Sequence, residues 1–335
     1  MEKQKQQENI FGNLLNKNNN KGEKINMKRM INQTHLEGLL YESKLEVKES
    51  GPNAKNPGTK FISGTIDIAT DDAGINIVPV HFTYVTEKTT KGSTNATYTT
   101  LMNIIDKKFG SVIANGKDNA VKLRIDSALN LNEFYTDRSG TEELVSAKRN
   151  EGGFVHVADA LSEDENARNT FTCDMLITNV SVKEADEEKN LPEKAIIKGA
   201  IFDFRNALLP VEFSAINPNA IDYFVGLGAS SKNPTFTKVW GRQVSETITR
   251  TITEESAFGD ASVREVKSSR KDFVITGASR EPYEWDSEGT ITANELAEAI
   301  ANRETYLATM KQRQDEYKAS KGANVAAPSN AGFNF

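Results

Sequence analysis

Residues 235–242, with the sequence TFTKVWGR, place aromatic and basic side chains at alternate positions. Side chains alternate between the two faces of a β-strand. The four residues expected on one face are therefore Phe236, Lys238, Trp240 and Arg242. Such a face suits single-stranded nucleic acid, because bases stack on aromatic rings while cations follow the phosphates. The competing interpretation is that Phe236 and Trp240 point into the core of the domain.

Catalytic signatures are missing from the sequence. It contains no Walker A loop, no dinucleotide-binding glycine fingerprint and no G-x-S-x-G elbow. Asp71 and Asp72 precede an Ala-Gly pair, which indicates a turn rather than a metal site. The single cysteine, Cys173, and only three scattered histidines argue against an internal disulfide and a metal site. We therefore expect no enzymatic activity, no cofactor and no metal.

The strands expected to position the aromatic and basic face of residues 235–242 belong to one of two similar units in the chain. In residues 31–160 and again in 161–283, three segments of alternating apolar and polar residues precede a short helical segment and two further strands. This order is that of the OB-fold, a five-stranded Greek-key barrel. A generic β-sandwich would also alternate, but it would not place a helix after the third strand. The sequence thus predicts a mainly β protein of two tandem OB-fold-like barrels.

Short motifs recur in the same order in both units. The VKE at 47–49 matches the VKE at 182–184, and the GTI at 64–66 matches the GAI at 199–201. Near the end of each unit, Phe154 is matched with Phe273. Conserved order with changing loop length indicates two copies of one fold.

Further aromatic and basic residues lie on matched elements of the two units and extend the candidate nucleic-acid surface. In the second unit they are Phe202, Phe204, Arg205, Lys267, Arg270, Lys271 and Phe273. In the first they are Lys60, Phe61, Lys122, Arg124, Lys148, Arg149 and Phe154. Two modules in tandem can follow one strand and gain avidity through effective concentration.

Composition sets the wider limits. The 335 residues include 41 Lys+Arg and 47 Asp+Glu, a net charge of −6, so a bulk electrostatic grip on duplex DNA is not expected. No stretch approaches the ~18–20 apolar residues of a membrane span, and the N-terminus lacks the apolar segment of a secretory signal. We expect a cytoplasmic protein.

The ends of the chain differ from the two units. Residues 1–30 and 319–335 are polar and low in apolar content, which predicts disordered tails. Residues 284–318 combine an acidic linker with one long helix, which starts at a capping-box pair, Thr292 and Glu295. The apolar face of this helix is interrupted by Arg303 and Gln314. It packs either on the protein's own barrels or on a partner.

Residues 236–246 resemble the late-strand segment of single-stranded DNA-binding proteins, in which an apolar strand ends in an aromatic, a glycine and a basic residue. Trp240, Gly241 and Arg242 match this pattern. The whole chain also looks like the longer bacteriophage members, with an Asn/Lys-rich tail, two barrel-like modules and a C-terminal extension. The resemblance implies non-sequence-specific coating of single-stranded DNA during replication, recombination or repair, without catalysis.

Two departures from that family stand out. The chain ends in Phe333-Asn334-Phe335 rather than in an acidic tip that recruits replication enzymes, although the segment at 284–288 is acidic. The first unit lacks the Trp-Gly-basic motif and has Arg124-Ile125-Asp126 nearby. The alternative function is a viral structural or assembly protein built from two β-modules. A buried Trp240 would favour that alternative.

Overall fold

The computed structural model describes residues 30–138, 141–185, 192–254, 262–287 and 290–323, with side chains except at 138, 246–254, 262–270 and 320–323. The first half forms barrel 1, in which β1 pairs with β2 and β4, β2 with β3, and β4 with β5. A parallel contact between β3 and β5 closes the barrel. Its strands are β1 (Asn32–Glu49), β2 (Lys60–Ala69), β3 (Ile77–Thr86), β4 (Lys122–Arg138) and β5 (Thr141–Val157). Between β3 and β4 lie α2 (Ala96–Ile105) and the short α3 (Val112–Asn115).

Barrel 2 repeats this topology. Here β6 pairs with β7 and β9, β7 with β8, β9 with β10, and a parallel contact between β8 and β10 closes the barrel. Its elements are β6 (Asn169–Lys183), β7 (Lys194–Phe202), β8 (Leu208–Ala215), α4 (Pro218–Gly226), β9 (Thr235–Glu254) and β10 (Ser262–Ala278). The predicted mainly β fold of two OB-fold-like barrels is confirmed, because both barrels have the strand order and helix position of that fold.

Gly64 in β2 and Gly199 in β7 show why the strands pack as they do. A Cβ at Gly64 would lie 2.1 Å from the carbonyl oxygen of Lys44, and one at Gly199 would lie 1.9 Å from that of Leu176. Each glycine therefore lets the second strand of its barrel approach the backbone of the first. The apolar alternation that the sequence shows buries Ile66 and Val80 in barrel 1, and Met175 and Ile197 in barrel 2.

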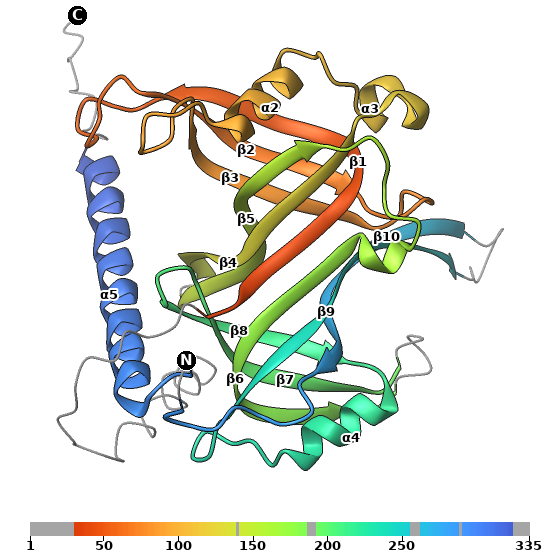
Figure 1. Cartoon of the computed structure of the whole chain (residues 1–335), viewed down its shortest axis with the longest axis vertical. Helices are drawn as coiled ribbons and strands as arrows, with labels where there is room; N and C mark the ends of the chain where they lie inside the picture. Colours follow the sequence, from red (N-terminus) through yellow and green to blue (C-terminus); the bar gives the residue numbers. More distant parts are fainter. Residues whose placement is uncertain (1–29, 139–140, 186–191, 255–261, 288–289, 324–335) are drawn as a thin grey trace, which may run out of the picture.

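The two barrels share one continuous ten-stranded sheet, because the first strands of both barrels pair with each other. β1 runs antiparallel to β6, from Asn32 opposite Cys173 to Leu36 opposite Asn169. We call this pairing the seam; β1 and β6 cross the middle of the molecule in Figure 1. Asn32 Nδ2 donates to the carbonyl of Leu129 in β4 at 2.9 Å, and Asn169 Nδ2 donates to that of Gln243 in β9 at 2.6 Å. The barrels are thus related across the seam by a local two-fold axis.

The last hairpin of each barrel extends against the other barrel. Leu129 and Leu131 of β4 contribute to the core of barrel 2. In return, the backbone amide of Ser245 in β9 donates to Asn76 Oδ1 of barrel 1 at 2.6 Å. These reciprocal contacts fix the orientation of one barrel relative to the other.

Helix α5 (Ala293–Ala323) follows barrel 2 and runs along one side of the molecule (Figure 1). The predicted capping box is confirmed: the Thr292 amide donates to Glu295 Oε2 at 2.9 Å, and the Glu295 amide donates to Thr292 Oγ1 at 3.2 Å. The helix continues to Ala323, into the segment for which the sequence predicts a tail. The remaining tail residues, 1–29 and 324–335, lie outside the described part of the chain.

The apolar face of α5 packs on the protein's own barrels, one of the two interpretations that the sequence left open. Leu296 and Ile300 are buried with Phe202 and Phe236 on the outer side of barrel 2. Further along, the Arg303 guanidinium pairs with Glu133 of β4 at 2.5 Å. None of the helices in the described ranges is long and apolar enough to cross a bilayer.

Candidate nucleic-acid interface

Lys238, Trp240 and Arg242 lie on the outer face of β9, as the alternation predicts. Val239 between them is fully buried in the core of barrel 2, which turns its neighbours outward. The Trp240 side chain is 40% exposed, and Arg242 is exposed. The competing interpretation, in which Trp240 points into the barrel, is therefore wrong. A ring and a guanidinium are presented together on a rigid strand.

Phe236 is on the same face of β9, but it is covered. Its ring is 2% exposed and packs edge-on against Phe202, with 6.2 Å between ring centroids. The segment that follows β10 lies over both rings, where Ile291 and Leu296 complete a buried cluster. Neither ring is open to a base, which corrects the expectation that Phe202 and Phe236 extend the exposed surface.

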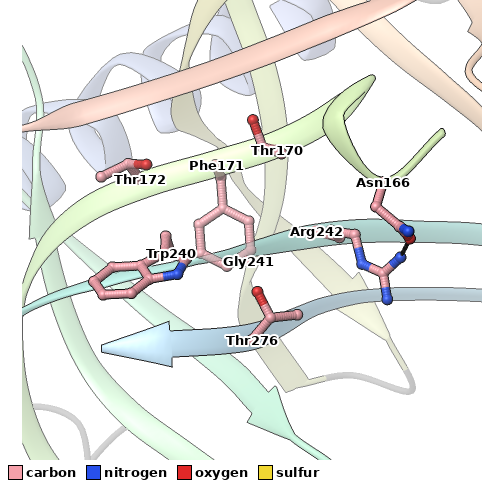
Figure 2. Close-up of a pocket in the computed structure, with 8 residues that line it drawn as sticks. All are labelled: Asn166, Thr170, Phe171, Thr172, Trp240, Gly241, Arg242 and Thr276. Carbon is pink, nitrogen blue, oxygen red and sulfur yellow. Dashed lines mark hydrogen bonds between the residues drawn. The ribbon is translucent and has the colours of Figure 1, made fainter. Parts of the chain in front are cut away.

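An open pocket lies beside Trp240, between β6, β9 and β10. Figure 2 shows Thr170 and Thr172 on one strand, Trp240 and Arg242 on the next, and Thr276 beyond them. The complete lining is Asn166, Thr170, Phe171, Thr172, Trp240, Gly241, Arg242 and Thr276. The hydroxyl and amide groups around an aromatic wall match what one unstacked nucleobase needs, a plane to stack on and partners for its edge.

Gly277 determines where the indole can lie. It pairs with Trp240 across β9 and β10, and a Cβ at position 277 would lie 2.4 Å from atoms of the indole ring. The Trp240 side chain thus extends over the space that a larger residue in β10 would fill. This glycine is not distinguishable as a site residue from the sequence, because its role depends on the register of the hairpin.

The connection between the barrels positions Arg242. Arg242 Nη1 donates a hydrogen bond to Asn166 Oδ1, which lies in the short 3-10 helix Glu165–Ala167 (Figure 2). That helix is held by barrel 1, because the backbone amide of Asp72 donates to Glu165 Oε1 at 2.6 Å. A hydrogen bond from Arg168 lowers the pKa of the Asp72 carboxyl, to which Arg168 is ion-paired at 2.7 Å. The cation on barrel 2 is therefore oriented through a chain of contacts that begins in barrel 1.

Glu37 is a buried carboxylate beside the seam. Burial alone would raise its pKa, but hydrogen bonds from the amide and hydroxyl of Ser162, and then from His35 and Arg124, lower the pKa to about 2. The Ser162 amide and hydroxyl each lie 2.8 Å from Oε2. Glu37 thus stays ionised and fixes the start of the connection between the barrels.

The predicted residues of barrel 1 are dispersed. Phe154 is 69% exposed on β5, whereas Phe61 is half-buried against Tyr84, with 4.4 Å between ring centroids. Three cations are engaged by protein groups, Lys122 with the Asp159 carbonyl, Arg124 with Glu37 and Arg149 with Glu151, whereas Lys60 is exposed.

Lys148 is a special case, because it serves the contact between the barrels. Its ammonium lies 5.6 Å from the ring centroid of Phe213 and 5.1 Å from that of Phe273 in barrel 2. Burial lowers its pKa. This placement corrects the expectation that Lys148 belongs to an open nucleic-acid surface.

The remaining predicted residues of barrel 2 fall in different places. Phe204 is 61% exposed in the β7–β8 turn, with the Arg205 guanidinium 4.8 Å from its ring centroid. Lys271 is exposed, but Phe273 is 8% exposed and packs in the barrel core against Phe171 and Phe213. Phe273 is thus not available for stacking. The side chains of Lys267 and Arg270 lie outside the described part of the chain.

Some exposed aromatic residues were not among the predicted site residues, and Trp285 and Tyr84 are two of them. Trp285 is 38% exposed, and its ring centroid lies 6.4 Å from that of Phe236, at the covered end of the β9 stripe. Tyr84 is 49% exposed on β3. The sequence offers Trp285 only as part of an acidic segment, so no alternation with cations marks it.

These features define a tandem OB-fold protein with an aromatic and basic strip on the outer face of its second barrel. The chain belongs to the YorF family, whose model matches residues 31–313. No curated protein sequence matches the chain. Among the described residues, no group of three or more His, Cys, Asp or Glu side chains is placed to hold a metal ion.

The solved structures to which the chain is similar include the single-stranded DNA binding protein from Thermus aquaticus. The wild-type structure is 10% identical over 76% of this chain and 95% of that chain, with a TM-score of 0.42. A deletion mutant of the same protein is 12% identical over 78% of this chain and 98% of that chain, also with a TM-score of 0.42. A Replication Protein A heterotrimer bound to single-stranded DNA is 11% identical over 84% of this chain and 70% of that chain, with a TM-score of 0.21.

Proposed function

We propose that the protein binds single-stranded DNA without strong sequence preference. The observation that carries this proposal is the exposed indole of Trp240, flanked on the same face of β9 by Lys238 and Arg242 and adjoined by an open pocket. A base stacks on the indole, and the two cations neutralise phosphates on either side of it. Stacking tolerates every base, because each one offers a π-face.

The biological role that we infer from this activity is the coating and protection of single-stranded DNA during replication, recombination or repair. This role requires no catalytic step. We infer that the protein performs it in the cytoplasm, which is the host cytoplasm if the protein is viral. Replication or recombination proteins could bind through the C-terminal region, where Trp285 and its acidic neighbours lie partly exposed. The alternative of a viral assembly protein gains no support from Trp240, because the indole is exposed.

The test is a titration of labelled oligo-dT followed by fluorescence anisotropy, repeated at several salt concentrations. Trp240→Ala is expected to weaken binding by roughly 5- to 150-fold, the equivalent of about 1–3 kcal/mol for one stacked base. Trp240→Phe is the matched variant, since it keeps an aromatic plane and should retain much of the affinity. Absence of binding by the wild-type protein at low salt would refute the proposal.

A further inference from the structure

A row of side chains crosses the seam on the outer face of the shared sheet. Phe154 in β5 is opposite Asp126 in β4, and Asp126 is opposite His35 in β1. His35 is in turn opposite Thr170 in β6. Residues directly opposite each other in a ladder share a face. Because Phe171 pairs with Gly241, Thr170 is also next to Arg242, so the row runs without a break from barrel 1 to the pocket of barrel 2.

The local two-fold axis shows what the two ends of this row have in common. Because Asn32 and Asn169 make equivalent bonds to the carbonyls of residues 129 and 243, the position in barrel 1 equivalent to Trp240 is Asp126. Trp240 is opposite Gly277, whereas Asp126 is opposite Phe154. The pair Trp240–Gly277 in barrel 2 is therefore equivalent to the pair Asp126–Phe154 in barrel 1. Each pair carries one exposed aromatic ring, on the fourth strand of barrel 2 and on the fifth strand of barrel 1.

We propose that one DNA strand crosses the seam and stacks on both Trp240 and Phe154, so that the two barrels together form a single binding site. This inference rests on the proposed function. Four strand spacings separate β5 from β9 along the row, and at about 4.8 Å each they amount to roughly 19 Å. An oligonucleotide long enough to cover this distance engages the second ring at a high effective concentration.

The charges along the row are compatible with a DNA backbone. Both ring nitrogens of His35 face carboxylates, with Nδ1 2.6 Å from Asp126 Oδ1 and Nε2 3.1 Å from Glu37 Oε1. Arg124, which is 48% exposed, balances Glu37 at 2.9 Å. Glu37 is thus ion-paired with Arg124, His35 bridges Glu37 and Asp126, and Arg242 adds a cation at the end of the row.

A DNA strand cannot take the alternative route over the second and third strands of both barrels, because that face is covered in barrel 2. OB-folds commonly bind nucleic acid over their second and third strands, and in barrel 1 this face carries the ring of Tyr84 against Phe61. In barrel 2, the equivalent face is covered by the C-terminal segment, which buries Ala200, Phe202 and Leu208. A strand on this face of barrel 1 would therefore find no open counterpart on barrel 2. Along the row that crosses the seam, Phe154, Asp126 and Arg242 are exposed, and His35 and Thr170 are partly exposed.

The experiment is an affinity series with oligo-dT from about 4 to about 16 nucleotides, the range of site sizes for one OB-fold. The variants are Phe154→Ala, Trp240→Ala and, as the matched control on the competing face, Tyr84→Ala. Phe154 and Tyr84 are both exposed, so truncation of either leaves no cavity, and circular dichroism checks the fold. In the wild-type protein we expect affinity to rise steeply once the oligonucleotide is long enough to span the row.

Phe154→Ala is expected to remove roughly 5- to 150-fold of the affinity for the long oligonucleotide and to leave the shortest one unaffected. Tyr84→Ala should change neither. If the long oligonucleotide binds Phe154→Ala as it binds the wild type, or if Tyr84→Ala weakens it, the composite site is overturned, while Trp240-dependent binding of short oligonucleotides would still uphold the proposed function. If the wild type binds none of them, both proposals fail.

Discussion

Asn150 of barrel 1 and Gln243 of barrel 2 exchange two hydrogen bonds through their side-chain amides. Asn150 Nδ2 donates to Gln243 Oε1 at 2.8 Å, and Gln243 Nε2 donates to Asn150 Oδ1 at 3.0 Å. The side chains are 2% and 5% exposed, so each satisfies a polar group that water cannot reach. The pair lies where the hairpin of each barrel crosses the other barrel, and it requires one specific orientation of the two.

Asn150→Ala is expected to destabilise the protein by about 1–3 kcal/mol, because it leaves the amide of Gln243 buried without its partner. Urea unfolding measures the effect. The double variant Asn150→Leu/Gln243→Leu should cost less than the sum of the two single leucine variants, since it removes both polar groups. Additive single effects would show that the two amides are not coupled.

Arg303→Ala is expected to cost about 3–5 kcal/mol, because it leaves the carboxylate of Glu133 buried without a partner. The Glu133 side chain is 2% exposed and that of Arg303 is 11% exposed. The control is Arg313→Ala on the exposed part of α5, which should change stability by less than about 0.5 kcal/mol. Equal melting temperatures for the two variants would contradict this assignment.

Stability should fall in acid through Glu37. Its pKa is lowered from 4.5 to about 2 in the folded protein, so the folded state binds the proton more weakly than the unfolded state does. The contribution is complete above about pH 5 and is lost as the pH falls toward 2. Its upper limit is about 3.5 kcal/mol, at about 1.4 kcal/mol per pKa unit. Glu37→Gln should flatten the measured dependence of unfolding free energy on pH in this range, and an unchanged slope would contradict the prediction.

Gly277→Val is expected to weaken DNA binding with little change in stability, because the atoms that the new side chain meets belong to the exposed indole of Trp240 and not to the backbone. We expect a loss approaching that of Trp240→Ala, together with a shift in tryptophan emission. The matched control is Gly51→Val, since a Cβ at Gly51 meets nothing within 4 Å. Full affinity in Gly277→Val would show that the position of the indole does not matter.

Arg242→Gln should reduce the salt dependence of binding. Each phosphate contact to single-stranded DNA contributes about −0.7 to the slope of log K against log salt concentration, so the slope should become shallower by about 0.7. Lys108→Gln serves as the control, because Lys108 is an exposed cation on barrel 1 paired with Asp106 at 3.3 Å. An unaltered slope in Arg242→Gln would exclude a phosphate contact at this residue.

The sequence predicted those features of the fold that depend on residues close together in the chain. The alternation of residues 235–242 identified the outward face of Lys238, Trp240 and Arg242, and the recurring glycines marked Gly64 and Gly199. The burial of Phe236 could not be predicted in this way. The residues that cover it, Ile291 and Leu296, are distant in sequence and meet it only in the folded chain.

The matching of Phe154 with Phe273 failed for a different reason. Phe154 is 69% exposed and Phe273 is 8% exposed, so the two lie on opposite faces of their strands. Phe273 is opposite Gln243 and Asn150 is opposite Leu129, so the structural counterpart of Phe273 is Asn150, four residues before Phe154. A register shift between Asn150 and Phe154 places these two residues on opposite faces of β5. The sequence also could not show why polar residues interrupt the apolar face of α5. In the folded chain, Arg303 binds Glu133, and Gln314 accepts a hydrogen bond from the amide of Tyr135 at 3.0 Å.

The antiparallel pairing of β1 with β6 has a consequence for the direction of a bound strand. DNA has a 5′ and a 3′ end, and a two-fold axis turns one barrel around relative to the other. A strand that crosses the seam meets equivalent features of the two barrels in opposite polarity, so any preference that these features confer in barrel 1 is cancelled in barrel 2. On the composite site proposed above, polarity is distinguished where side chains differ between the barrels, as they do at Trp240 and Phe154. On that proposal, the two-fold arrangement of the barrels by itself favours neither direction of a bound strand.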